Sequence, residues 1–203
     1  MPSEEIAEIR EVLVAAARKT RSTGPDYTEM NDRIRRWMVD LARSVLPIYL
    51  DVGRRVRTEK RLVVSALEST RQACSGEFVR GSDDANEALK FFPAAIADML
   101  HNEELSGYHP TLSASRAALQ AIQTAVSSAA DYDIHSLTAK ATMLAEQCAL
   151  SQAYVLAEAR DIGVASALAS TRSDFGEIYL SALINRLDDD MSYGPSTSVP
   201  AKG

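Results

Sequence analysis

The sequence predicts an all-α protein, a multi-helix bundle of about seven or eight helices with one long central helix at residues 135–161. Apolar residues recur at intervals of three and four along most of the chain, as on the buried face of an amphipathic helix. No alternating run of apolar and polar residues is long enough to indicate a strand. Hydrophobic residues make up 46% of the 203 residues and charged residues 25%, which is typical of a folded globular chain.

The amino-terminal part is predicted to form three helices. Ser3 can cap the first, and residues 22–26 break the chain before a second helix begins at Thr28. Pro47 should kink or end that second helix, because proline lacks a backbone donor and clashes with the preceding turn. A third helix follows to about Ala73. The inward positions of the three helices are Ile6, Ile9, Leu13, Ala17, Met30, Ile34, Trp37, Met38, Leu41, Val45, Leu62, Val63, Ala66 and Leu67.

The middle of the chain is predicted to form shorter helices. After a loop at residues 76–81, a short helix begins at Ser82. Pro93 is expected to start a further helix from its first position, where a missing backbone donor has no cost. Residues 112–130 are rich in Ala and Ser, so a neighbouring helix can approach them closely.

The long central helix is expected to begin at Asp133 or Ser136 and to carry apolar residues on two opposite faces. Such a helix lies at the centre of its bundle or is covered by another subunit. An Ala-rich turn follows, and a capping box at Thr171–Asp174 is predicted to begin the last helix. We expect one domain over residues 1–190 and a flexible tail at residues 191–203.

The charge is distributed unevenly along a chain whose formal net charge is −6. Residues 1–80 hold 15 Lys and Arg against 12 Asp and Glu, whereas the remainder holds 7 against 16. This asymmetry favours head-to-tail contact between copies or an anionic ligand near the front, although ordinary unevenness explains it equally well. Two distant cysteines, no signal peptide and no long apolar stretch predict a cytoplasmic, intracellular protein with reduced thiols and no membrane span.

The strongest candidate for a binding site is a dense run of cations, here called the basic segment, that consists of Arg54, Arg55, Arg57, Lys60 and Arg61. Asp51 and Glu59 can offset only part of this charge. Three interpretations stay open: a solvated face, contact with an acidic surface of a neighbouring copy, and a phosphate track that contacts only nucleic-acid backbone. Arg33 is an ambiguous further candidate for the same site.

Other polar residues have simpler explanations. Arg36 has Asp32 four residues before it and Asp40 four residues after it, which predicts local pairing on one helix. Cys148 lies within an apolar stripe and is expected to be a buried, inert thiol. Trp37 lies between apolar neighbours on its helix and is expected in the core or an interface.

Common catalytic motifs are absent from the sequence, so no catalytic residue, cofactor or metal is assigned and the protein is not expected to be an enzyme. Asp131, Asp133 and His135 could hold a metal in an extended segment, but Asp133 is more simply the cap of the following helix. His101 and His109 are interpreted as residues of surface loops.

These features predict a non-enzymatic, self-assembling structural protein, most concretely a capsid or filament (coat) subunit. Its expected partners are copies of itself and single-stranded nucleic acid bound through phosphates. The helical make-up, the excess of Arg over Lys, a Phe175–Glu177 turn and the polar tail resemble coat proteins of rod-shaped plant viruses, which implies location in a virion. No site residue is carried over from that resemblance.

Two alternative functions stay open. One is an intracellular helical adaptor or regulator that presents a groove to a partner helix. The other is an enzyme with an unrecognised site near His101, Glu104, His109 or residues 131–135.

Overall fold

The computed structural model describes residues 4–23, 27–52, 60–74, 82–106 and 109–188, and every regular element in these ranges is helical. This confirms the predicted all-α class. The α-helices are α1 (Glu4–Thr23), α2 (Tyr27–Val52), α3 (Lys60–Ala73), α4 (Ser82–Ser106), α5 (Pro110–Ser127), α6 (Ile134–Arg160), α7 (Val164–Phe175) and α8 (Ser181–Asp188). A 3₁₀ turn at Ser128–Ala130 follows α5, and a π-helical turn at Gly176–Leu180 connects α7 to α8. The predicted cap at Ser3, the loop at 76–81 and the tail at 191–203 lie outside the described residues.

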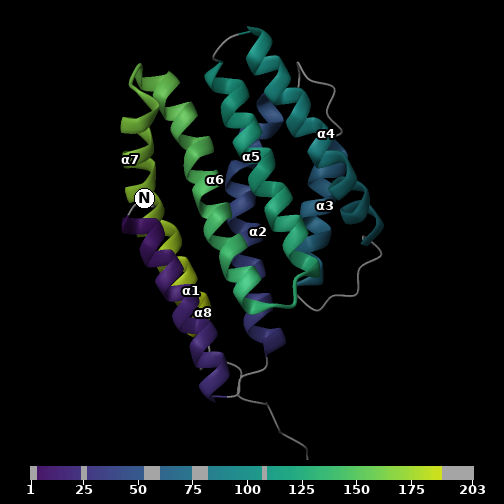
Figure 1. The fold of residues 1–203 in the computed structure, drawn as a ribbon, viewed down its shortest axis with the longest axis vertical. Coiled ribbons are helices and arrows are strands. Elements are labelled where there is room, and N and C mark those ends of the chain that lie inside the picture. Colours follow the sequence, from purple (N-terminus) through teal and green to yellow (C-terminus); the bar gives the residue numbers. More distant parts are fainter. Residues whose placement is uncertain (1–3, 24–26, 53–59, 75–81, 107–108, 189–203) are drawn as a thin grey trace, which may run out of the picture.

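The helices form a bundle in which α2, α5 and α6 pack against one another (Figure 1). Helices α3 and α4 lie at one edge, where α4 also contacts α5. Helices α1, α7 and α8 lie at the opposite edge, beyond α6 (Figure 1). The edge formed by α4 and the edge formed by α1 therefore face away from each other.

The core contains the apolar stripes that the sequence indicates. Its largest fully buried side chains are Tyr49, Phe92, Ile6, Ile9, Leu13, Ile34, Met38, Leu41, Leu67, Met99 and Leu119. Each fully buried Leu or Ile stabilises the fold by ~1.5–3 kcal/mol relative to exposure. The small residues of α5 allow close packing as expected, because Ser151 of α6 reaches the backbone of α5 and donates to the Ala114 carbonyl at 2.8 Å.

The two ends of α6 agree with the prediction. Asp133 caps its amino end and accepts hydrogen bonds from the backbone amides of His135 and Ser136, at 3.4 and 3.0 Å. At its carboxyl end Asp161 adopts a left-handed conformation with φ 52° and ψ 47°. Asp is one of the few residues that tolerate this conformation, which stops the helix and turns the chain back toward α7.

Proline does not interrupt either helix that contains it. The predicted restart at Pro93 is wrong, because α4 is continuous from Ser82 to Ser106. Of the two outcomes expected at Pro47, a kink or an end of the helix, the end is wrong, because α2 continues to Val52. Both prolines are exposed, so water can hydrate the carbonyl groups that lack a donor, and the buried stripes continue past them (Val45 and Tyr49 in α2; Ala88, Phe92, Ala95 and Met99 in α4).

The last part of the chain is more helical than predicted. The Ala-rich segment after Gly163 belongs to α7, and Thr171 lies inside that helix instead of capping a new one. Ala is the strongest helix former, and buried Ala167 packs against Ala153 and Ala157 of α6. The predicted turn at Phe175–Glu177 is likewise helical, because α7 runs into the π-helical turn there.

Replacing Pro93 by Ala should increase stability. The new backbone amide can donate to the Leu89 carbonyl and the ring clash disappears, so the free energy of unfolding should rise by about 1–3 kcal/mol. Urea unfolding measures this change. Pro110→Ala is the matched control, since Pro110 is at the first turn of α5, and it should leave stability unchanged within about 0.5 kcal/mol. Destabilisation by Pro93→Ala would contradict the continuous helix.

Candidate functional site

The structure describes part of the predicted basic segment. Arg54, Arg55 and Arg57 lie outside the described residues. Lys60 is the first residue of α3, and its ammonium donates to the Leu50 carbonyl near the carboxyl end of α2. Arg61 is exposed beside it, and the first turn of α3 contains no acidic residue. The described members of the segment therefore place two cations at the positive end of a helix dipole.

Arg33 contacts other parts of the same chain. Its guanidinium forms an ion pair with Glu29 at 2.6 Å and donates to the Leu187 carbonyl at 3.2 Å. The side chain is 13% exposed, so most of it is covered by α2 and α8. These contacts join the amino end of α2 to the carboxyl end of α8, and a role for Arg33 in binding a partner stays a prediction.

The predicted pairing of Arg36 is wrong. Its Nε donates to the Cys74 carbonyl at 2.9 Å, just beyond the end of α3. Asp32 instead binds Arg35 at 2.7 Å, and Asp40 binds Arg186 of α8. Tertiary contacts take Arg36 and Asp40 away from their expected pair, because an exposed pair within one helix is worth only a few tenths of a kcal/mol, whereas Asp32 pairs locally with Arg35 instead.

Among the described residues, Arg35 is a heavily engaged polar side chain that the sequence analysis did not single out. It is 6% exposed and lies under the turn that connects α5 to α6. Its Nε donates to the Ser128 carbonyl at 3.0 Å, and one Nη donates to the Asp131 carbonyl. The Tyr132 ring lies over the guanidinium, 5.8 Å from Cζ to the ring centroid. Together with Asp32, these groups provide partners for the Arg35 guanidinium, whose burial without partners would cost several kcal/mol of free energy.

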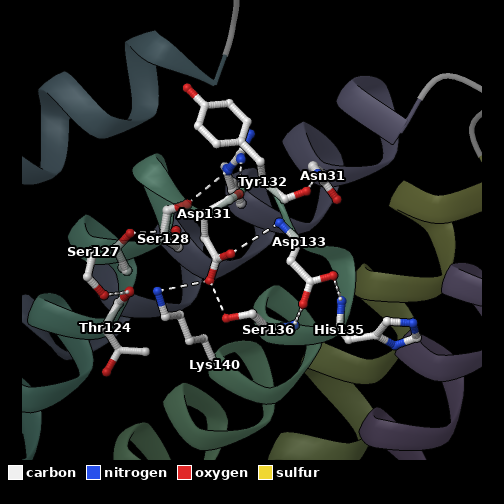
Figure 2. A network of polar contacts seen from close by, with 12 residues as sticks. Asn31, Thr124, Ser127, Ser128, Asp131, Tyr132, Asp133, His135, Ser136 and Lys140 are labelled. Carbon is white, nitrogen blue, oxygen red and sulfur yellow. Dashed lines mark hydrogen bonds and ion pairs between the residues drawn. The ribbon is translucent and has the colours of Figure 1, made fainter.

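Figure 2 shows how the same turn is fixed from the α6 side. The Asp131 carboxylate accepts from the Ser136 hydroxyl at 2.5 Å, from Lys140 Nζ at 3.0 Å and from the Asp133 amide at 3.2 Å. Burial acts to raise the pKa of Asp131, but the hydrogen bonds from Ser136 and Lys140 and the charge of Lys140 outweigh burial and hold it below its usual value.

The possible metal ligands in this turn have other partners. Asp131 is engaged by Ser136 and Lys140, and Asp133 caps α6. Within the described ranges, no group of three His, Cys, Asp or Glu side chains is arranged to hold a metal ion. His101 and His109 are exposed, with His101 inside α4 instead of in a loop and His109 at the cap position of α5.

The interior positions predicted for Cys148 and Trp37 are confirmed. Cys148 is fully buried, its thiol lies 3.7 Å from the Leu41 carbonyl, and burial raises its pKa far above that of a free thiol. Burial, reinforced by the Asp32 carboxylate, also raises the pKa of Cys74 to about 11. Trp37 is 2% exposed and donates from Nε1 to the Tyr179 carbonyl at 3.0 Å.

A groove of about 1040 Å³ lies between α1 and α6. Its apolar part includes Val14 and Ala15 of α1 and Ala139 and Met143 of α6. Its charged residues are Arg10, Glu11, Arg18 and Glu146, and His135 lies near the amino end of α6. Glu146 already forms an ion pair with Arg172 of α7 at 2.9 Å. Sequence patterns could not reveal this groove, because it depends on which two helices become neighbours.

The described residues form an all-helical bundle with a groove of apolar and charged lining between α1 and α6. Comparisons with protein-family models, with curated proteins and with solved structures find no match. The likeness to viral coat proteins therefore rests on the sequence features alone. No helix among the described residues has the length and apolar character needed to cross a membrane.

Replacing Arg35 by Met should destabilise the protein strongly. The substitution leaves two buried carbonyl groups and Asp32 without their donor, so the free energy of unfolding should fall by about 2–4 kcal/mol. Guanidinium unfolding measures the loss. Arg43→Met is the control, because Arg43 is exposed on the same helix, and it should change stability by less than about 0.5 kcal/mol. Equal effects of the two substitutions would show that Arg35 does not fix the turn.

The contribution of Asp131 to stability should depend on pH. Its pKa is lower in the folded than in the unfolded state, so its stabilising effect is present above the unfolded pKa of about 3.9 and is lost as the pH falls through the folded pKa. The difference in unfolding free energy between wild type and Asp131→Asn should therefore be largest near pH 7 and shrink below about pH 4.

Urea unfolding across this pH range measures that difference. Ser136→Ala removes the hydroxyl donor to Asp131 and should reduce the pH-dependent part without abolishing it, since Lys140 remains. If the difference in unfolding free energy between wild type and Asp131→Asn stayed constant from pH 7 to pH 3, the lowered pKa of Asp131 would be contradicted.

Proposed function

We propose that the protein is a non-enzymatic structural subunit that self-assembles, as a filament or coat subunit. The observation that supports this best is the unbalanced positive charge at the start of α3. Lys60 and Arg61 stand at the positive end of the helix dipole, where the first turn offers no acid to offset them. An acidic surface of a neighbouring copy would supply that charge, and the chain after residue 80 is acidic on balance, with 16 Asp and Glu against 7 Lys and Arg.

The arrangement of the helices suits repeated contact between copies. We propose α6, at Ile134–Arg160, as the long central helix of a bundle of seven or eight helices, since it contacts α1, α2, α5 and α7. The edges formed by α1 and by α4 lie on opposite sides of the bundle (Figure 1). Two different surfaces on opposite sides generate head-to-tail contacts, which build rings or filaments.

Nucleic acid is the second proposed partner of such a subunit, which would act in the cytoplasm or in a virion. The basic segment would contact phosphates only, because no aromatic side chain lies within it to stack on bases. Such contacts weaken steeply as salt concentration rises.

A helical binding module is the second candidate function, and the groove between α1 and α6 favours it. Grooves between two helices bind amphipathic helices of partner proteins through their apolar faces. Light scattering separates the two functions, since an assembling subunit forms large particles and a binding module stays a monomer or dimer.

Reversing three charges of the basic segment should abolish assembly. In the variant Arg54→Glu, Arg57→Glu, Arg61→Glu, repulsion replaces attraction to an acidic surface, and large particles should fall at least tenfold. Light scattering at constant protein concentration measures this, and circular dichroism checks that the helices remain. Retention on a single-stranded nucleic-acid column should fall in parallel if phosphates are contacted.

The matched control reverses three cations elsewhere: Lys19→Glu, Arg43→Glu and Arg160→Glu. All three are exposed, and the net charge change is the same. This control should assemble as the wild type does. If the variant of the basic segment forms particles as the wild type does, the basic segment has no role in assembly. If the wild type remains monomeric, self-assembly is rejected.

A further inference from the structure

We propose that the groove between α1 and α6 receives helix α4 of a second copy. This inference rests on the proposed self-assembly and names the two surfaces that would meet. The charge and the side-chain size of both surfaces indicate this occupant.

The groove offers a row of small and apolar residues beside exposed cations. Ala15 and Ala139 leave room for a helix backbone, and Met143, which is 47% exposed, offers a flexible apolar contact. Arg10 and Arg18 are exposed on α1, and eight residues of helix place them about 12 Å apart along it. This distance is slightly more than two helical turns, so the long arginine side chains can reach acids that lie roughly two to three turns apart on an incoming helix.

The acidic residues of the groove do not cancel this positive character. Glu146 is engaged by Arg172 of its own chain at 2.9 Å. With Glu146 neutralised by Arg172, Glu11 is the only acid among the described lining residues left to offset Arg10 and Arg18, which leaves an excess of one positive charge. A helix rich in acids is therefore the occupant that the groove favours.

Helix α4 has the matching properties. Its sequence contains six acidic residues and only one basic residue, Lys90. Glu87 and Asp98 are exposed on it, and the exposed residues between them include Ala94 and Ala97. These small side chains would let the helix approach the floor of the groove closely.

A chain cannot fill its own groove in this way, because α4 and α1 lie at opposite edges of the bundle (Figure 1). The contact must form between copies, and the two surfaces differ. Each copy would therefore use its groove on one side and its α4 on the other, which gives an open filament or a closed ring.

Charge reversal on each surface tests this contact. The groove variant, Arg10→Glu with Arg18→Glu, and the helix variant, Glu87→Arg with Asp98→Arg, should each reduce large particles at least tenfold. Light scattering and electron microscopy give the readout, and circular dichroism confirms folding. The control, Lys19→Glu with Arg160→Glu, changes the same net charge as the groove variant on other exposed positions and should assemble normally.

Mixing the two variants provides the decisive measurement. An acidic groove from one variant then meets a basic α4 from the other, and the unchanged surfaces of the two variants also remain complementary. Particles should reappear in the equimolar mixture to at least half of the wild-type amount. No other pairing of surfaces predicts this recovery.

The possible failures are distinguishable. If wild type assembles and both variants assemble equally well, the groove does not receive α4, while self-assembly stands. Failure of the mixture to recover would also overturn the α4 assignment, and would indicate another occupant of the groove. A wild type that stays monomeric at all concentrations would reject the proposed function and this contact together.

Discussion

The bundle depends on one buried guanidinium. Arg35 of α2 binds the carbonyl groups of Ser128 and Asp131, which belong to the turn between α5 and α6. A charge inside a protein is tolerable only when nearly all of its donors are satisfied, so the turn must sit in one position relative to α2. Asn31 strengthens this arrangement by donating from Nδ2 to the Tyr132 carbonyl at 3.1 Å. The register of three packed helices is thereby fixed at one end.

The helices themselves were largely predictable, because burial of a repeating apolar stripe dominates their formation. The same buried stripe explains why the helix starts predicted at Pro93 and Thr171 were wrong. Rules for Pro93 and Thr171 consider only the local backbone, whereas the buried residues on either side hold each helix together across the position. A local rule is reliable only where tertiary packing does not oppose it.

The polar contacts were much harder to predict. Arg35 and Arg36 are neighbours in sequence, yet about 100° separates them around the helix, so one is buried under a turn and the other reaches the end of α3. Their acceptors are backbone carbonyls, which every residue possesses and which leave no trace in the sequence. The groove is hidden for a related reason, since Arg10 and Met143 become neighbours only after α1 docks on α6.

The buried thiol of Cys148 can report how often the bundle opens. It is fully buried between α6 and α2 and stays protonated, so an alkylating reagent cannot attack it in the closed state. Its modification requires these two helices to separate first. The rate of this modification would therefore measure how often α2 and α6 separate in the folded protein.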